Sequence, residues 1–293
     1  MSRKEKSMHP HKIISGVGLL IFAALFCLAG GCSDEKTPAS PSNTGSLTDP
    51  EFIQVQDQVN IFLDSAQNYF AEGFENIYKV PVDTENVINN YGPMGPTDTA
   101  TFGYYDGWYV VYISRNNAFT ASVLVDSVQY QDNGEVIEDP SGLDYLHFIR
   151  KWDFVFKNTS VSHVNQSAYL NLEYSGLDQS VAAINGTNDV FVKWVYVSND
   201  STVEAQYDMD VTVNDVKISR VPNYPWSSGC PTSGNMEIDI NQSYLLSNED
   251  GKTMRVRSWV VSVTFDDGQA SVSVSSEGKT WSYTRTVCLP PSN

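Results

Sequence analysis

Histidine is the side chain best suited to general acid–base catalysis near neutral pH. Beyond the first thirty residues the chain keeps only His147 and His163. His147 falls on the polar side of an alternating, strand-like run, which favours a solvated or hydrogen-bonded histidine over a catalytic base. The sequence contains no nucleophile elbow, no zinc-protease helix motif, no phosphate-binding loop and no dinucleotide fingerprint. We therefore expect no enzymatic activity, and a hydrolase is the weakest of three functional hypotheses.

Two acidic turns are the remaining candidates for metal chemistry. Asp266-Asp267-Gly268 and Glu249-Asp250-Gly251 offer oxygen ligands that calcium accepts, but neither has the ligand spacing of an EF-hand loop. Hairpin turns account for both, so we expect no metal site and no cofactor. The two catalytic carboxylates of a glycosidase could not be identified from the sequence among so many Asp and Glu residues.

The densest aromatic stretch covers residues 102–112. Exposed Tyr and Trp side chains stack on sugars or line apolar pockets, so Tyr104, Tyr105, Trp108 and Tyr109 are the candidate ligand-binding residues. The alternative is a strand whose aromatics are buried in the sheet on one side and covered by a helix on the other.

The N-terminus has the three-part plan of a secretory signal. Residues 1–12 carry four basic side chains, residues 13–28 are nearly all apolar, and small residues follow. The segment Leu28-Ala29-Gly30-Gly31-Cys32 resembles the lipobox of bacterial lipoproteins, although the large apolar residue stands one place early. The resemblance covers only residues 1–32, and we recognise no family for the rest of the chain.

The lipobox resemblance implies cleavage after Gly31, with Cys32 as the lipid-attachment residue bearing palmitate-type acyl chains. Each buried methylene contributes about 0.8 kcal/mol, so several chains anchor a protein stably. Ser33 rather than Asp follows the cysteine, which by analogy with lipoprotein sorting implies the outer membrane, on either its periplasmic or its surface face. The alternative is an uncleaved anchor, because residues 13–31 approach the roughly 20 apolar residues that span a bilayer.

Cys230 and Cys288 are the two cysteines left once Cys27 is removed with the leader and Cys32 is lipidated. In an exported chain such a pair predicts a disulfide, which stabilises a loop of this size by about 4 kcal/mol. Two free thiols or shared metal ligation are the alternatives. The sequence has no CxxC motif, so we expect a structural clasp.

One amphipathic helix is predicted after a polar tether. Thr48 reads as its N-cap, with Pro50 just inside and Glu51 completing a capping box. Apolar residues then recur at spacings of three and four as far as Phe70, which predicts a helix to about Glu72, closed by Gly73. The helix should cover a sheet or plug a barrel mouth.

The rest of the chain alternates with the period of two that is typical of strands. Apolar residues of 146–156 and of 203–213 fall on one side of each run, with polar residues between them. Near Ser258 the apolar register changes parity, which predicts a β-bulge or bend. Hairpin signals separate the runs: Asp132-Asn133-Gly134, Asn199-Asp200, Glu249-Asp250-Gly251, Asp266-Asp267-Gly268 and Glu277-Gly278. We predict a mainly β fold, an antiparallel meander of about ten strands that forms a barrel, a half-barrel or two stacked sheets.

These features divide the chain into four parts. They are a signal peptide (1–31), the lipidated cysteine with a disordered tether (32–48), a helix plus antiparallel β domain (49–229) and a disulfide-clasped β segment packed on it (230–293).

The charge balance bears on partners. Lys and Arg number 18 against 35 Asp and Glu, a net charge of −17 that makes nucleic acid a poor partner. We expect a lipid-anchored cell-envelope protein acting as a structural or interaction module, with envelope proteins, polysaccharide or lipid as partners. The alternative is a carrier that holds an apolar or amphipathic ligand in a β cavity.

Overall fold

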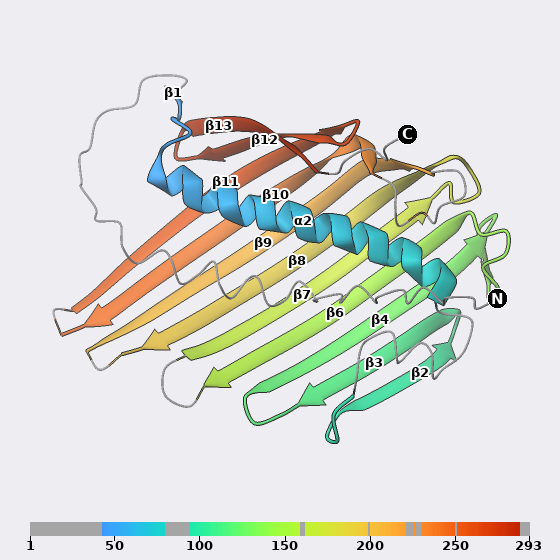
Figure 1. Cartoon of the computed structure of the whole chain (residues 1–293), viewed down its shortest axis with the longest axis horizontal. Helices are drawn as coiled ribbons and strands as arrows, with labels where there is room; N and C mark the ends of the chain where they lie inside the picture. The colour runs from blue at the N-terminus through green and yellow to red at the C-terminus, as the bar shows by residue number, and fades with distance from the viewer. Residues whose placement is uncertain are drawn as a thin grey trace, which may run out of the picture.

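The computed structural model describes residues 43–79, 94–158, 162–198, 200–220, 226, 230–249 and 251–287. They form one sheet of thirteen strands and one long helix, α2 (Pro50–Lys79), which lies across one face of the sheet (Figure 1). The leader and Cys32 lie outside the described residues.

Strands adjacent in the chain are nearly always adjacent in the sheet, in the order β1-β13-β12-β11-β10-β9-β8-β7-β6-β4-β3-β2. Only the short β5 leaves this path, pairing with β4 alone. The strands are β1 (Asn43–Thr44), β2 (Thr99–Tyr105), β3 (Trp108–Asn116), β4 (Thr120–Asp132), β5 (Glu135–Ile137), β6 (Tyr145–Asn158), β7 (Ser162–Ser175), β8 (Val181–Val197), β9 (Ser201–Ser219), β10 (Pro231–Asn248), β11 (Gly251–Asp266), β12 (Gln269–Ser276) and β13 (Lys279–Thr286).

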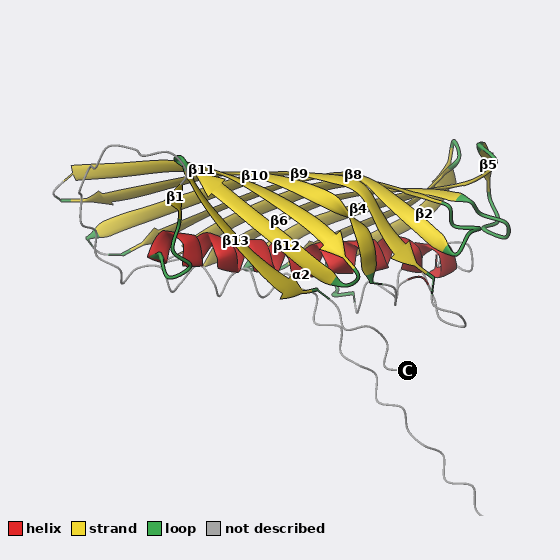
Figure 2. Ribbon diagram, turned by 90° about the horizontal axis from the view of Figure 1, so that it is seen from above, coloured by secondary structure: helices red, strands yellow, loops and turns green. Residues whose placement is uncertain are grey.

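The predicted fold class is confirmed: the protein is mainly β, an antiparallel meander with one N-terminal helix. The sheet is not closed, since β2 and β1 stand at opposite ends of the strand order, and it is a single layer. The closed barrel and the two stacked sheets are therefore wrong. Figure 2 shows α2 against one face of the twisted sheet, with β12 and β13 curling toward the helix.

Short turns set the register of the meander. Asn133-Gly134, Asp267-Gly268 and Glu277-Gly278 all have positive φ at both positions and each joins two antiparallel strands, as two-residue hairpins require. Asp106-Gly107 has the same geometry, with φ of 49° and 83°. That turn lies inside the aromatic stretch 102–112, which therefore forms the β2–β3 hairpin and not one strand.

The helix starts one residue later and ends seven residues later than predicted. Asp49, not Thr48, holds the N-cap position, because its carbonyl accepts the first helical hydrogen bond from Ile53 at 3.0 Å. Gly73 does not end the helix. A Cβ on Gly73 would stand 2.0 Å from the Tyr174 hydroxyl, so this glycine permits a close approach of helix to sheet rather than a C-cap.

β11 has no bulge near Ser258. It pairs with β10 in one unbroken register from Asn235–Thr264 to Asn248–Gly251. The parity change arises because Met254 and Val256 face the uncovered side of the sheet, where they are 66% and 64% exposed. An exposed apolar pair, not a backbone irregularity, explains the pattern.

The predicted tether and domain boundary need adjustment at their edges. Asn43 and Thr44, assigned to the tether, pair in parallel with Lys279 and Thr280 of β13. β10 pairs with β9 along its length, so the C-terminal segment continues the same sheet.

Candidate binding surface on the inner face

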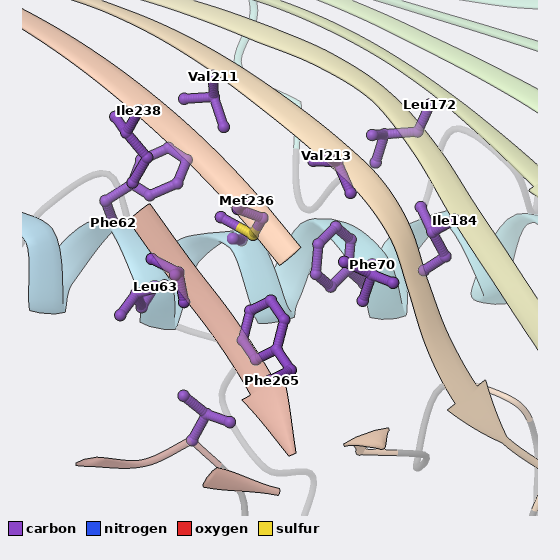
Figure 3. Packing of buried hydrophobic residues seen from close by; sticks show 14 of the residues in the cluster. Phe62, Leu63, Phe70, Leu172, Ile184, Val211, Val213, Met236, Ile238 and Phe265 are labelled. Atoms are coloured by element: carbon purple, nitrogen blue, oxygen red, sulfur yellow. The ribbon is translucent and has the colours of Figure 1, made fainter. Parts of the chain in front are cut away.

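The inner face is the face of the sheet that α2 crosses, and the outer face is the opposite one. Under α2 the inner face is filled with apolar side chains (Figure 3). Phe62, Leu63 and Phe70 of the helix reach sheet residues such as Met236 and Ile184, and all five are at most 7% exposed. Helix and sheet thus share one apolar core, whose burial drives their association.

Aromatic stacking fixes the helix at both ends. Near its N-terminus, Phe52 stacks on Trp281 of β13 with ring centroids 5.4 Å apart. Near its C-terminus, Phe74 stacks on Trp226 at 5.4 Å and meets Tyr174 edge-on at 4.9 Å. Trp226 is 2% exposed, so it belongs to the core that Phe74 packs against.

Polar contacts also join α2 to the sheet. Asp126 of β4, which is 2% exposed, accepts two hydrogen bonds of 2.7 Å from Arg150 of β6. Arg150 also donates to Glu72 of α2, so one guanidinium links two strands and the helix. At the other end of the helix, Tyr283 donates to the Asn60 side chain at 3.0 Å, and burial raises the pKa of Tyr283 to about 12.

The strands continue well past α2, and no other described helix lies over this part of the inner face (Figure 1). Two cross-strand rows define what we call the distal inner face. The first row is Phe154, Gln166, Val192, Tyr207 and Gln242. The second row is Phe156, Val164, Trp194, Ala205 and Tyr244.

The distal inner face is apolar and aromatic, but its burial is incomplete. Phe154, Val192, Trp194 and Tyr244 are all half-buried, in contrast to the nearly inaccessible residues under α2. The distal inner face has the composition of a ligand surface, mostly apolar with a few polar groups.

Three polar side chains on or beside this surface lack partners. Gln166 and Asn188 are each 2% exposed, yet the Gln166 Oε1 atom and both amide atoms of Asn188 accept or donate no hydrogen bond. The Trp194 indole Nε1 is likewise buried and unpartnered. Leaving a buried polar group unsatisfied costs about 1–3 kcal/mol. Trp259 and Trp281 have the same deficit in the core under α2. Gln166 and Trp194 differ from them in being diagonal neighbours on adjacent strands.

The four predicted ligand-binding aromatics do not form one site, because the Asp106-Gly107 turn places them on both faces. Tyr104 and Tyr109 pair on the inner side, with rings 4.7 Å apart, and the Tyr109 hydroxyl donates to the Glu138 carbonyl at 2.9 Å. Tyr105 and Trp108 pair on the outer side, where Tyr105 is 67% exposed.

The two histidines are separated along the sheet. His147 lies on the outer face beneath Trp108, at 5.0 Å between ring centroids, and shares a 2.6 Å hydrogen bond with the Asn171 side chain. His163 lies sixteen residues further along the β6–β7 hairpin, near the far end of β7. No described contact joins either ring to a carboxylate, and no group of three His, Cys, Asp or Glu among the described residues is arranged to hold a metal.

The outer face carries an acidic ladder that the sequence pattern did not reveal. Asp189, Asp210 and Asp239 stand directly opposite one another on β8, β9 and β10, and all three are exposed. Like charges in such positions repel. Their solvation keeps this cost small, and the ladder concentrates negative potential at the centre of the outer face.

Cys230 is half-buried immediately before β10, and Cys288 lies outside the described residues. Their predicted bridge therefore remains a prediction. Among the described residues, no helical stretch is both long and apolar enough to cross a bilayer.

Comparison with protein-family models, with curated proteins and with solved structures gives no match for this chain. Its function must therefore be inferred from its own residues and their geometry.

Proposed function

We propose that this chain is a lipid-anchored cell-envelope protein that works as an interaction module, binding its partner non-catalytically. The observation that carries the proposal is the open sheet: α2 fills part of one face, while the outer face has no described element over it. A single broad sheet gives a rigid surface about as long as its strands. Such a surface suits recognition of an extended partner better than enclosure of a small substrate.

The anchor is supported by the lipobox-like segment that ends at Cys32 and by the position of β1. The first strand begins at Asn43, so ten residues separate the proposed lipid on Cys32 from the sheet edge. This distance is at most about 40 Å for an extended chain. Metabolic labelling with a palmitate analogue should mark the wild type and not Cys32→Ser. Equal labelling of the wild type and of Cys32→Ser would contradict lipid attachment at Cys32.

A Cys230–Cys288 clasp is supported by the backbone beside both cysteines. The Gly268 amide donates to the Pro231 carbonyl at 2.9 Å, and the Val287 amide donates to the Gly268 carbonyl at 3.0 Å. The residue after Cys230 and the residue before Cys288 thus meet the same turn. We expect mass analysis of the non-reduced protein to recover one peptide pair that joins the two cysteines. Alkylation of both thiols without prior reduction would refute the clasp.

The binding role can be tested on the outer face, where Met254 and Val256 expose apolar surface on β11, the strand that places Val260 opposite Asp239 of the acidic ladder. A photo-crosslinking amino acid at Met254 should give a discrete covalent adduct in intact cells. The same group at Thr284, which is also exposed on the outer face but lies among Ser and Thr residues, is the control. Identical adduct patterns at the two positions would argue against a specific partner.

A carrier of an apolar or amphipathic ligand is the second candidate. An enclosed β cavity is not supported under α2, where the apolar side chains of helix and sheet form one buried cluster. The half-buried distal inner face favours a different form, in which the ligand lies on the sheet beside α2.

A further inference from the structure

The distal inner face holds hydrogen-bonding groups that the protein itself does not satisfy. Gln166 of β7 faces Phe154 of β6 and Val192 of β8, and all three side chains point to the inner face. The amide is 2% exposed, and its Oε1 atom has no donor. Folding normally places such an atom in contact with water or a partner.

A matching donor stands diagonally across β7 and β8. Trp194 pairs with Val164, two residues from Gln166, and its Nε1 is also buried without an acceptor. Diagonal neighbours on antiparallel strands are roughly 7 Å apart, close enough for one small group to bond both side chains. A hydroxyl or an amide can donate to Gln166 and accept from Trp194 at once, whereas a purely apolar molecule satisfies neither.

The surface between these groups and the helix accepts an aliphatic chain. Along β8 the inner-face positions from Trp194 back to Asn188 are Val192 and Val190, a path of about 20 Å. Val190 packs against the edge of the core under α2, so the apolar surface is continuous. Asn188 ends the path with two further unpartnered amide atoms.

The inner-face side chains next to Gln166 and Trp194 are uncharged, which favours a neutral ligand at this position. Asp126, Arg150 and Glu72, the charged groups where α2 meets β4 and β6, are bonded to one another. The rows from Phe154 to Gln242 and from Phe156 to Tyr244 contain no ionisable group other than tyrosine. The rows continue into Arg257 and Arg255 of β11, three strands away from Trp194.

We propose that the distal inner face binds a neutral amphipathic molecule, with a hydroxyl or amide group between Gln166 and Trp194 and an aliphatic chain along Val192 and Val190. This inference rests on the carrier form of the proposed function and names its ligand class. It does not depend on the outer-face partner, because that surface is on the opposite side of the sheet.

The test uses the chain from Ser33 onward, since all described structure begins after that residue. The probe is 1-decanoylglycerol, titrated below its critical micelle concentration and followed by tryptophan fluorescence. The comparison probe is its dimethyl ether, which has the same chain but cannot donate a hydrogen bond. We expect saturable one-to-one binding of 1-decanoylglycerol and at least tenfold weaker binding of the ether.

Gln166→Leu keeps the size of the side chain and removes its acceptor, so this variant should fold and bind 1-decanoylglycerol at least tenfold more weakly. Gln206→Leu is the matched control, because Gln206 lies on the outer face of β9 and bonds Asp208 at 2.9 Å. Absence of saturable binding, equal affinity for the ether, or unchanged affinity in Gln166→Leu would each overturn the proposal. A surviving photo-crosslink at Met254 in that case would leave the interaction module standing without the ligand.

Discussion

The two halves of the inner face are built from the same strands but serve different purposes. Under α2, side chains such as Phe52, Phe74 and Ile184 are completely buried, and the Tyr174 hydroxyl approaches the carbonyls of Tyr69 and Phe70 at 3.3 and 3.4 Å. On the distal inner face, aromatic residues are half-buried and buried amides lack partners. The covered half holds the fold together, whereas the distal half retains unsatisfied surface that a ligand can complete.

The largest expected effect separates the halves directly. Phe74→Ala should destabilise the protein by about 3–5 kcal/mol, since it removes a fully buried ring that packs on Tyr174 and Trp226. Phe154→Ala, the matched truncation on the distal inner face, should cost about 1–2 kcal/mol because that ring is only half-buried. Urea unfolding of both variants measures the difference. Equal losses would show that the two halves contribute alike.

The next effect concerns the polar link between α2 and the sheet. Asp126→Ala leaves Arg150 without its buried bidentate partner, although Glu72 still binds the guanidinium. We expect a loss of roughly 2–3 kcal/mol in the free energy of unfolding. Asp153→Ala, an exposed acid on the outer side of β6, is the control and should change stability by less than about 0.5 kcal/mol.

Removing an unsatisfied group should have a smaller and opposite effect. Gln166→Leu is expected to stabilise the ligand-free protein by about 1 kcal/mol, because the buried Oε1 atom no longer lacks a donor. This corresponds to a rise in Tm of about 2–4 °C for a chain of this size. A clear fall in Tm would mean that the amide is satisfied in the folded protein.

The smallest effect is a pH dependence in the covered half. Burial raises the pKa of Tyr283 from 10.0 to about 12, so the folded state favours the neutral phenol. The resulting stability is fully present below pH 10 and is lost as the pH rises from 10 to 12. Tyr283→Phe should lose less stability than the wild type over that interval, in parallel denaturation series. Identical pH profiles would exclude Tyr283 as a contributor.

Much of the fold is visible in the sequence because strand alternation records which face meets water. The even-numbered residues of 146–156 and the odd-numbered residues of 203–213 face inward as predicted, and tight turns such as Asn133-Gly134 fall where positive φ is required. The prediction failed where one residue type has two physical uses. The sequence pattern predicts a helix end at Gly73, but this glycine allows the helix to approach Tyr174 closely. The pattern also treats Met254 as a core residue, but its side chain is exposed on the outer face.

The candidate site was harder to predict. The Asp106-Gly107 turn lies within the run of aromatics and forms a hairpin there. The site predicted from aromatic composition is therefore divided, with Tyr104 and Tyr109 on one face of the sheet and Tyr105 and Trp108 on the other. Gln166 interrupts an otherwise apolar alternation on β7, and that interruption is the signal that could have marked it. Its lack of a partner depends on the neighbours that β6 and β8 supply, which only the three-dimensional structure reveals.

Hydrogen exchange along β8 tests the contrast between the two halves most directly, because this one strand runs from the covered half into the distal half. We expect amides of residues 182–188 to exchange most slowly. Residues 190–197 should exchange faster in the free protein and slow down when 1-decanoylglycerol is added. Uniform protection along the strand, unaffected by the probe, would contradict the account.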